Sequence, residues 1–224
     1  RKGIIVPDNQ YDRPLVDESI DRMVRKVYDQ LSWASTHDEL TGLLGRREFE
    51  RMLDQQLARR EDQRALVLLD LRQFRLLNDT AGYQAGDEAL RRVADVLRSH
   101  VGDGMPLARF SGNEFAFMLP AENALDASRG IVSAIEAMEF VFDSGSYHLS
   151  ASVGLAPELP ALANAERWLK AAEEAMKSAK KRGHGKVMEY TLDAHDHARQ
   201  EQIAAKVANL GDLNEERMLL RCQK

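Results

Sequence analysis

The feature that most constrains the fold is the stretch RFSGNEFAFML, which runs from Arg109 to Leu119. Apolar residues flank a short polar centre that contains Gly112 and Glu114. This pattern predicts a β-hairpin with a tight turn, because glycine tolerates the backbone angles that such turns need. A turn of this kind brings backbone close to a ligand and leaves a carboxylate within reach of it.

The rest of the chain interleaves predicted helices and strands. An almost wholly apolar run at 65–71 predicts a buried central strand. Apolar residues at helical spacing predict helices over 14–35, 46–60, 86–100, 123–138 and 166–181. A second hairpin is expected from 139–142 and 147–155, and a last strand at 186–190. Helices interleaved with antiparallel hairpins predict an α+β fold with helices on the faces of a sheet.

Composition argues against several functions. Charged residues make up 30% of the 224 residues and the net charge is −5, so a general nucleic-acid-binding surface is not expected. The single cysteine, Cys222, cannot form an internal disulfide and suits a reducing compartment. No apolar run approaches the roughly 18 residues of a membrane span. We therefore expect a cytoplasmic domain; a membrane anchor elsewhere in a longer protein is left open.

Five further motifs follow one another along the chain. They are HDELTGLLGRREF (37–49), LLDLRQFRLLND (68–79), AGYQAGDEAL (81–90), SASVGLA (150–156) and AMKSAKKRGHGKV (175–187). In this order and spacing, and with the hairpin, they resemble the GGDEF family, the diguanylate cyclases. The resemblance implies a central, mostly antiparallel sheet flanked by helices, similar to nucleotidyl cyclases and polymerase palm domains. It also implies chemistry that joins two GTP molecules into cyclic di-GMP with the help of divalent metal ions.

The hairpin departs from the family signature R-x-G-G-D/E-E-F at two positions. Ser111 replaces the first glycine, and a positive φ there would strain it by roughly 1 kcal/mol. Asn113 replaces the essential acid, and asparagine can neither take a proton nor bring negative charge to a hard metal ion. Arg72, where the family usually has Asp, lies on the same strand face as Asp70. The change from Asp to Arg72 adds +2 and the change from acid to Asn113 adds +1, so the local charge shifts by +3. We therefore expect no catalytic residue at Asn113.

The remaining metal-binding groups are those that the resemblance implies. They are the carboxylate of Asp70, the backbone carbonyl of Leu71 and, more weakly, the carboxylate of Glu114. A carboxylate that ends a buried strand is costly unless it has a partner, which favours a ligand site over a turn cap. We expect Mg²⁺ to bind weakly, with a contact between Glu114 and Arg72 as the alternative.

The resemblance places guanine recognition at Asn78 and Asp87. An amide and a carboxylate together match the hydrogen-bonding edge of guanine. Both residues also suit structural roles, because Asn78 could cap a turn and Asp87 could N-cap the helix expected after it.

The phosphate side of a bound nucleotide is expected at four other positions. The resemblance implies Arg75 and Lys180 near the phosphates and the backbone of Gly112 close to them. Arg72 could act as a bidentate phosphate donor. The alternative for Lys180 is an ordinary solvated helix end favoured by the helix dipole.

Three segments are expected in the chain. Residues 1–35 form an N-terminal segment and linker helix, which either pairs in a homodimer or folds back on its own domain. Residues 36–191 form a degenerate GGDEF domain. Residues 192–224 form a second linker helix and the start of an EAL domain, because NEERMLLRCQK (214–224) resembles the opening of EAL phosphodiesterases.

Together these features predict a degenerate GGDEF domain in cyclic di-GMP signalling. We expect it to bind GTP and to regulate a C-terminal EAL phosphodiesterase. A weakly active diguanylate cyclase is one alternative, and a nucleotide-free scaffold for dimerisation and signal relay is the other.

Overall fold

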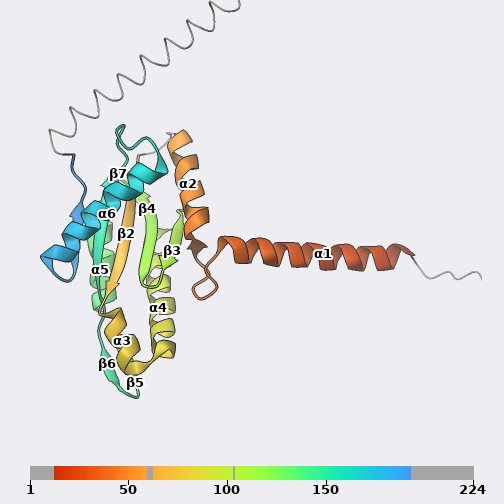
Figure 1. Cartoon of the computed structure of the whole chain (residues 1–224), viewed down its shortest axis with the longest axis horizontal. Helices are drawn as coiled ribbons and strands as arrows, with labels where there is room; N and C mark the ends of the chain where they lie inside the picture. Colours follow the sequence, from red (N-terminus) through yellow and green to blue (C-terminus); the bar gives the residue numbers. More distant parts are fainter. Residues whose placement is uncertain (1–12, 60–62, 103, 193–224) are drawn as a thin grey trace, which may run out of the picture.

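The computed structural model describes residues 13–59, 63–102 and 104–192 (Figure 1). Its helices are α1 (Arg13–Thr36), α2 (Arg46–Arg59), α3 (Phe74–Ala81), α4 (Tyr83–Val101), α5 (Ala124–Glu136) and α6 (Ala165–Arg182). Its strands are β1 (Leu44–Gly45), β2 (Arg64–Arg72), β3 (Leu107–Ser111), β4 (Glu114–Pro120), β5 (Phe140–Phe142), β6 (Gly145–Tyr147), β7 (Ser150–Pro157) and β8 (Lys186–Glu189).

A six-stranded sheet in the order β1-β3-β4-β2-β7-β8 forms the centre of the domain. The apolar strand β2 lies inside it and pairs antiparallel with both β4 and β7. The pairs at the two edges, β1 with β3 and β7 with β8, are parallel. The predicted α+β fold with a mostly antiparallel sheet is therefore confirmed.

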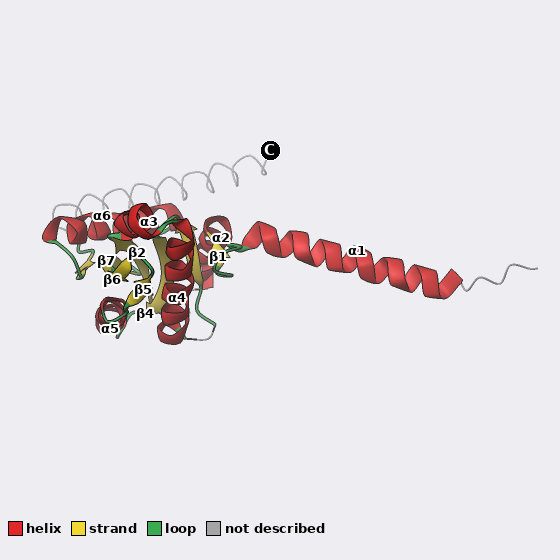
Figure 2. Cartoon of the chain, turned by 90° about the horizontal axis from the view of Figure 1, so that it is seen from below, coloured by secondary structure: helices red, strands yellow, loops and turns green. Residues whose placement is uncertain are grey.

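Both faces of the sheet are covered, as Figure 2 shows for α6 on one side and α5 on the other. Along β2, Val67 and Leu69 belong to the core shared with α3, α4 and α5. Leu66 and Leu68 belong to the core shared with α2 and α6. Because side chains alternate along a strand, Asp70 and Arg72 follow Leu68 on the face of α2 and α6.

Two predicted elements differ from the structure. Residues 74–81, where a turn near Asn78 and no helix was expected, form α3, because Phe74 and Leu77 pack into the core beside α4. Helix α4 accordingly begins at Tyr83 rather than Gly86, so Asp87 lies inside the helix and is not its N-cap. Asn78 likewise lies within α3.

The second predicted hairpin is correct in its turn and wrong in its second strand. Phe142 pairs with Gly145, but the partner strand β6 ends at Tyr147. The apolar segment that follows forms β7, which joins the central sheet between β2 and β8. Its residues are buried on both faces, so two neighbouring strands suit it better than one exposed hairpin partner.

Helix α6 packs unusually close to β7. A Cβ atom at Gly154 would collide with the backbone of α6 at Ala172 and Met176. The indole Nε1 of Trp168 donates a hydrogen bond of 2.9 Å to the carbonyl of Ala156. These contacts fix α6 along the sheet, with its last turn near the end of β2.

Helix α1 extends away from the domain (Figures 1 and 2). Ile20, Val24, Val27 and Leu31 are exposed along it at spacings of four and three residues. The alternative in which this helix folds back on its own domain is therefore wrong. None of the helices in the described part of the chain is long and apolar enough to span a membrane.

Candidate functional site

The hairpin of β3 and β4 presents its turn at the end of the sheet where β2 also ends. Gly112 adopts a left-handed conformation, with φ 46°. Gln73 is the only non-glycine residue with a positive φ among those described, so the strain expected at Ser111 is absent. The guanidinium of Arg109 donates hydrogen bonds of 3.0 and 2.8 Å to the carbonyl of Gly112 and so holds the turn.

Arg109 also joins the hairpin to the segment that follows α1. Its Nη1 lies 3.1 and 3.0 Å from the two carboxylate oxygens of Asp38. Burial would raise the pKa of Asp38, but hydrogen bonds from Thr41 and from Arg109 outweigh that effect and hold the pKa below its ordinary value of 3.8. Asp38 and Arg109 were not predicted as functional residues from the sequence, although both lie in conspicuous motifs.

The residues expected to bind metal meet at the end of β2. We call the group of Asp70, Leu71, Arg72, Asn113, Glu114 and Lys180 the strand-end cluster. The carboxylate of Asp70 is 9% exposed, and its Oδ2 accepts a hydrogen bond of 2.7 Å from Nζ of Lys180. Nη1 of Arg72 lies 3.8 Å from the other oxygen. Asp70 therefore has two cationic neighbours from the protein itself.

Asn113 and Leu71 form a second pair in the strand-end cluster. The backbone N–H of Leu71 donates to the carbonyl of Asn113 at 3.0 Å. The side-chain Nδ2 of Asn113 donates in return to the carbonyl of Leu71 at 2.6 Å. The residue that replaces the family acid thus provides a hydrogen-bond donor to the carbonyl that the family would offer to a metal.

This donor set is a poor fit for Mg²⁺. The ion prefers several oxygen ligands in near-octahedral geometry. Here a carboxylate oxygen of Asp70 and the carbonyl of Leu71 each already accept a hydrogen bond from nitrogen. Within the described residues no group of three or more His, Cys, Asp or Glu side chains is placed to hold a metal ion.

Glu114 lies beside Asp70, to which it is the cross-strand partner in the β2–β4 pairing. Its side chain has no ion pair with Arg72, contrary to the alternative raised from the sequence. Together with Lys180, Phe110 and other residues it lines a cavity of about 260 Å³ between the sheet and α6. Of the two acidic side chains in the strand-end cluster, Asp70 is paired with Arg72 and Lys180, whereas Glu114 has no ion pair with either cation.

The residues expected to read guanine lie on α3 and α4. We call Asn78, Gly86 and Asp87 the α3–α4 group. The Oδ1 atom of Asn78 is buried and accepts no hydrogen bond from the described part of the chain. A Cβ atom at Gly86 would collide with this oxygen, so any larger residue there would force the carboxamide to move. Asp87 is half-buried one residue further along α4.

Two residues in or next to these groups, Gly86 and Gln73, were not predicted from the sequence. Gly86 lies in the motif AGYQAGDEAL, where a glycine inside a helical pattern is itself a signal of close approach. Gln73, with φ 63°, makes the sharp bend from β2 into α3. A left-handed glutamine costs about 1–2 kcal/mol, and such strain is concentrated at functional sites.

Arg75 is not drawn into either group. Its side chain is 94% exposed and its Nε lies 3.6 Å from Asp79 one turn further along α3. The structure therefore brings Lys180 and Arg72 together at Asp70 and leaves Arg75 in solvent.

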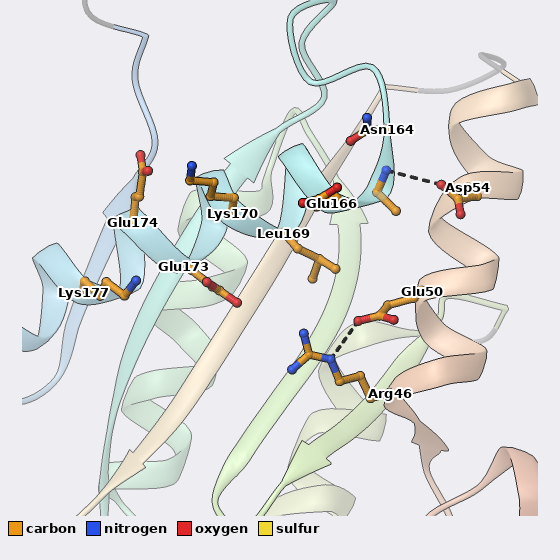
Figure 3. A pocket seen from close by; sticks show the side chains of 11 residues that line it. Arg46, Glu50, Asp54, Asn164, Glu166, Leu169, Lys170, Glu173, Glu174 and Lys177 are labelled. Carbon is orange, nitrogen blue, oxygen red and sulfur yellow. Dashed lines mark hydrogen bonds and ion pairs between the residues drawn. The ribbon is translucent and has the colours of Figure 1, made fainter.

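A larger groove, of about 660 Å³, lies between α2 and α6 (Figure 3). Its walls carry charges of both signs, and Arg46 is paired with Glu50 at 2.7 Å. Oδ1 of Asp54 accepts a hydrogen bond of 3.3 Å from the backbone of Ala165 and so links the two helices. The groove is not lined by the α3–α4 group, so it does not mark the expected base site.

The family described as "Diguanylate cyclase, GGDEF domain" matches residues 35–186. The chain belongs to the GGDEF family. It is thus a domain of cyclic di-GMP signalling, whose relatives include named diguanylate cyclases.

Two curated relatives illustrate the range of GGDEF proteins that the chain resembles. It is 33% identical over 160 residues to the probable diguanylate cyclase DgcC of Escherichia coli, a match over 69% of this chain and 43% of that protein. It is 33% identical over 164 residues to the cyclic di-GMP phosphodiesterase PdeB of Shewanella oneidensis, over 72% of this chain and 19% of that protein. The chain therefore spans less than half the length of these relatives.

Solved structures of GGDEF domains share the fold. The coiled coil and GGDEF domain of DgcB from Caulobacter crescentus, solved in complex with c-di-GMP, superimposes with a TM-score of 0.72 at 26% identity. The match covers 78% of this chain and 96% of that one.

Proposed function

We propose that this GGDEF domain binds a guanine nucleotide without joining two GTP molecules, and that nucleotide binding regulates an EAL phosphodiesterase that follows it. The observation that carries this proposal is the pairing of Asn113 with Leu71. An amide at this position neither accepts a proton nor neutralises charge in phosphoryl transfer.

Charge and hydrogen bonding in the strand-end cluster weigh against cyclase chemistry. Two-metal catalysis needs carboxylates that hold ions beside the reacting phosphates. Asp70 is already neutralised by Lys180, and the carbonyl of Leu71 is already bonded to Asn113. Building a metal site here would require both interactions to break.

The α3–α4 group supports the binding of a nucleotide. A buried acceptor without a partner costs about 1–3 kcal/mol. The buried oxygen of Asn78 is such an acceptor, and a donor on the edge of guanine would relieve that cost after a small rotation of the carboxamide. Asp87, which has no ion pair within the described residues, would accept from the remaining N–H groups.

The partner domain is proposed from sequence and from one relative. The segment that resembles an EAL domain, with the rest of 193–224, lies outside the described residues. The similarity to the phosphodiesterase PdeB supports a GGDEF domain in such a protein.

A dimerisation scaffold without a nucleotide is the second candidate, and α1 favours it. The exposed stripe of Ile20, Val24, Val27 and Leu31 matches the a/d spacing of a coiled coil. Pairing through α1 is compatible with nucleotide binding, so only the absence of binding would favour a pure scaffold.

The test has two parts on the purified chain. The first measures cyclic di-GMP by chromatography after incubation with Mg²⁺ and GTP, with the Asn113→Asp variant alongside. The second titrates GTP by calorimetry. We expect saturable binding without product. Product formation at rates typical of an enzyme would identify a cyclase, and no binding at millimolar GTP would leave the scaffold.

A further inference from the structure

We infer that the proposed nucleotide site recognises the guanine base, and that its affinity depends little on the number of phosphates or on divalent metal. GMP, GDP and GTP would then be equivalent ligands. This inference rests on the proposed binding of a guanine nucleotide and specifies its ligand class.

The charges of the strand-end cluster cancel. Asp70 and Glu114 contribute two negative charges, while Arg72 and Lys180 contribute two positive charges. The sum is zero, so the cluster offers no net attraction to a polyphosphate. A site that selects a triphosphate over a monophosphate needs surplus positive charge, from a metal ion or from side chains, to balance each added phosphate.

Of the two cations in the strand-end cluster, Lys180 already has a close partner inside the protein. For Lys180 to reach a phosphate, its 2.7 Å hydrogen bond to Asp70 must break and leave a carboxylate that is 9% exposed. A contact from Lys180 to phosphate therefore replaces an equivalent contact inside the protein, so its net contribution to affinity is small. Arg72 is held less firmly, because its Nη1 lies 3.8 Å from Asp70, beyond hydrogen-bond distance, and its Nε is buried without a partner among the described residues. It is the one cation of the cluster that could turn to a phosphate at little cost, and its single charge is offset by Glu114, the cross-strand neighbour of Asp70.

The remaining cation expected near the phosphates is Arg75. Arg75 is 94% exposed, and an interaction between a solvated guanidinium and a phosphate is screened by water and salt. Arg75 therefore adds little discrimination between nucleotides of different phosphate count.

The α3–α4 group, the proposed base site, differs from the strand-end cluster because its polar side chains lack side-chain partners in the described part of the chain. Asn78 and Asp87 make no hydrogen bond or ion pair with another side chain of the described residues. Gly86 preserves the space beside the carboxamide of Asn78. Hydrogen bonds from these groups to guanine depend on neither metal nor phosphate, so discrimination between guanine and adenine is retained when metal is removed.

The test is a calorimetric titration of the chain with GTP, GDP, GMP and guanosine, each in Mg²⁺ and again in EDTA, with ATP as the base control. We expect dissociation constants for the three guanine nucleotides within about threefold of one another, unchanged by EDTA, and at least about tenfold weaker binding of ATP. Raising the salt concentration should change them little.

Two variants make the result specific to the base site. Asp87→Ala should weaken GMP and GTP by the same factor. Glu88→Ala changes the neighbouring exposed residue, whose ion pair within the described residues is with Arg91 on the helix surface, and it should leave both affinities unchanged. Circular dichroism checks that each variant is folded.

Each contrary result has a separate meaning. GTP that binds tenfold or more tightly than GMP, or that needs Mg²⁺, overturns the inference and leaves the proposed nucleotide binding intact. Failure of every guanine ligand to bind the folded wild-type chain overturns both.

Discussion

The strand-end cluster and the α3–α4 group lie on neighbouring segments but are satisfied to very different degrees. In the cluster, Asp70 is held by Lys180 and the carbonyl of Leu71 by Asn113, and only Nε of Arg72 is buried without a partner among the described residues. In the α3–α4 group, the oxygen of Asn78 is buried without a partner. A polar group that has a protein partner gains little from a ligand, whereas one without a partner gains much. The comparison separates a part of the site that stabilises the fold from a part that remains available for binding.

The largest expected effect comes from filling the α3–α4 group. Gly86→Ala places a methyl group on the oxygen of Asn78 and should weaken guanine-nucleotide binding by about thirtyfold, or about 2 kcal/mol. Calorimetric titration of the variant measures the loss.

Gly130→Ala is the matched control for that substitution. Gly130 lies in α5 with open space around it, so alanine there should only add helix propensity, about 1 kcal/mol of stability. Unchanged binding by Gly86→Ala would remove Asn78 from the base site.

The next prediction tests whether the ion pair in the strand-end cluster stabilises the fold. Lys180→Met leaves the carboxylate of Asp70 with only the more distant Arg72 and should lower the free energy of unfolding by about 1.5 kcal/mol. Urea denaturation measures it. Lys177→Met, an exposed change one turn earlier in α6, should stay within about 0.5 kcal/mol of wild type. Equal stabilities of the two variants would show that the ion pair contributes nothing.

A third effect reverses the character of the cluster. The double variant Arg72→Asp/Asn113→Asp shifts the local charge by −3 and removes the amide donor from the carbonyl of Leu71. Mg²⁺ should then raise its Tm by about 2–4 °C, since binding to the folded state stabilises it, while the wild type does not respond. Thermal denaturation with and without Mg²⁺ measures the difference.

Asn123→Asp, at the exposed start of α5, controls for an added charge elsewhere. A wild-type response to Mg²⁺ as large as that of the double variant would contradict the poor fit of the present donor set.

The smallest effect concerns the contact between Asp38 and Arg109 beside the hairpin. The pKa of Asp38 is lower in the folded state than its ordinary value of 3.8, so the unfolded chain binds more protons in that range. This contribution to stability is complete above pH 3.8 and is lost as the pH falls further. Asp38→Asn should therefore show a shallower loss of stability in acid than wild type, by less than one proton. Denaturant titrations between about pH 2 and pH 6 provide the measurement, with the exposed Asp126→Asn as control. Parallel acid limbs for wild type and Asp38→Asn would refute it.

Much of the fold was predictable because its signals are local. The apolar run of β2, the turn at Gly112 and the period of α4 each determine one element. Helix α3 was missed because eight residues give too short a period, and it forms by packing Leu77 against the core. The division between β6 and β7 was missed because only the sheet decides where an apolar strand pairs.

The sequence named the residues that meet in the strand-end cluster, but it did not predict their contacts, and it placed Arg75 near them although its side chain lies in solvent. The motifs indicated Asp70, Lys180 and Asn113, but no spacing in the sequence predicts that Lys180 crosses from α6 to Asp70. The bond from Asn113 to Leu71 likewise depends on how the hairpin turn settles beside β2. Such contacts join residues far apart in the chain, and a linear pattern carries no information about their geometry.

The close approach of α6 to β7 at Gly154 has a consequence for electrostatics. A residue with any side chain at this position would lift α6 off the sheet, because the obstructing atoms are backbone and cannot turn aside. Lys180 would move with the helix and lose its reach to Asp70. A glycine that has no charge and lies on another strand therefore sets the local potential at the end of β2.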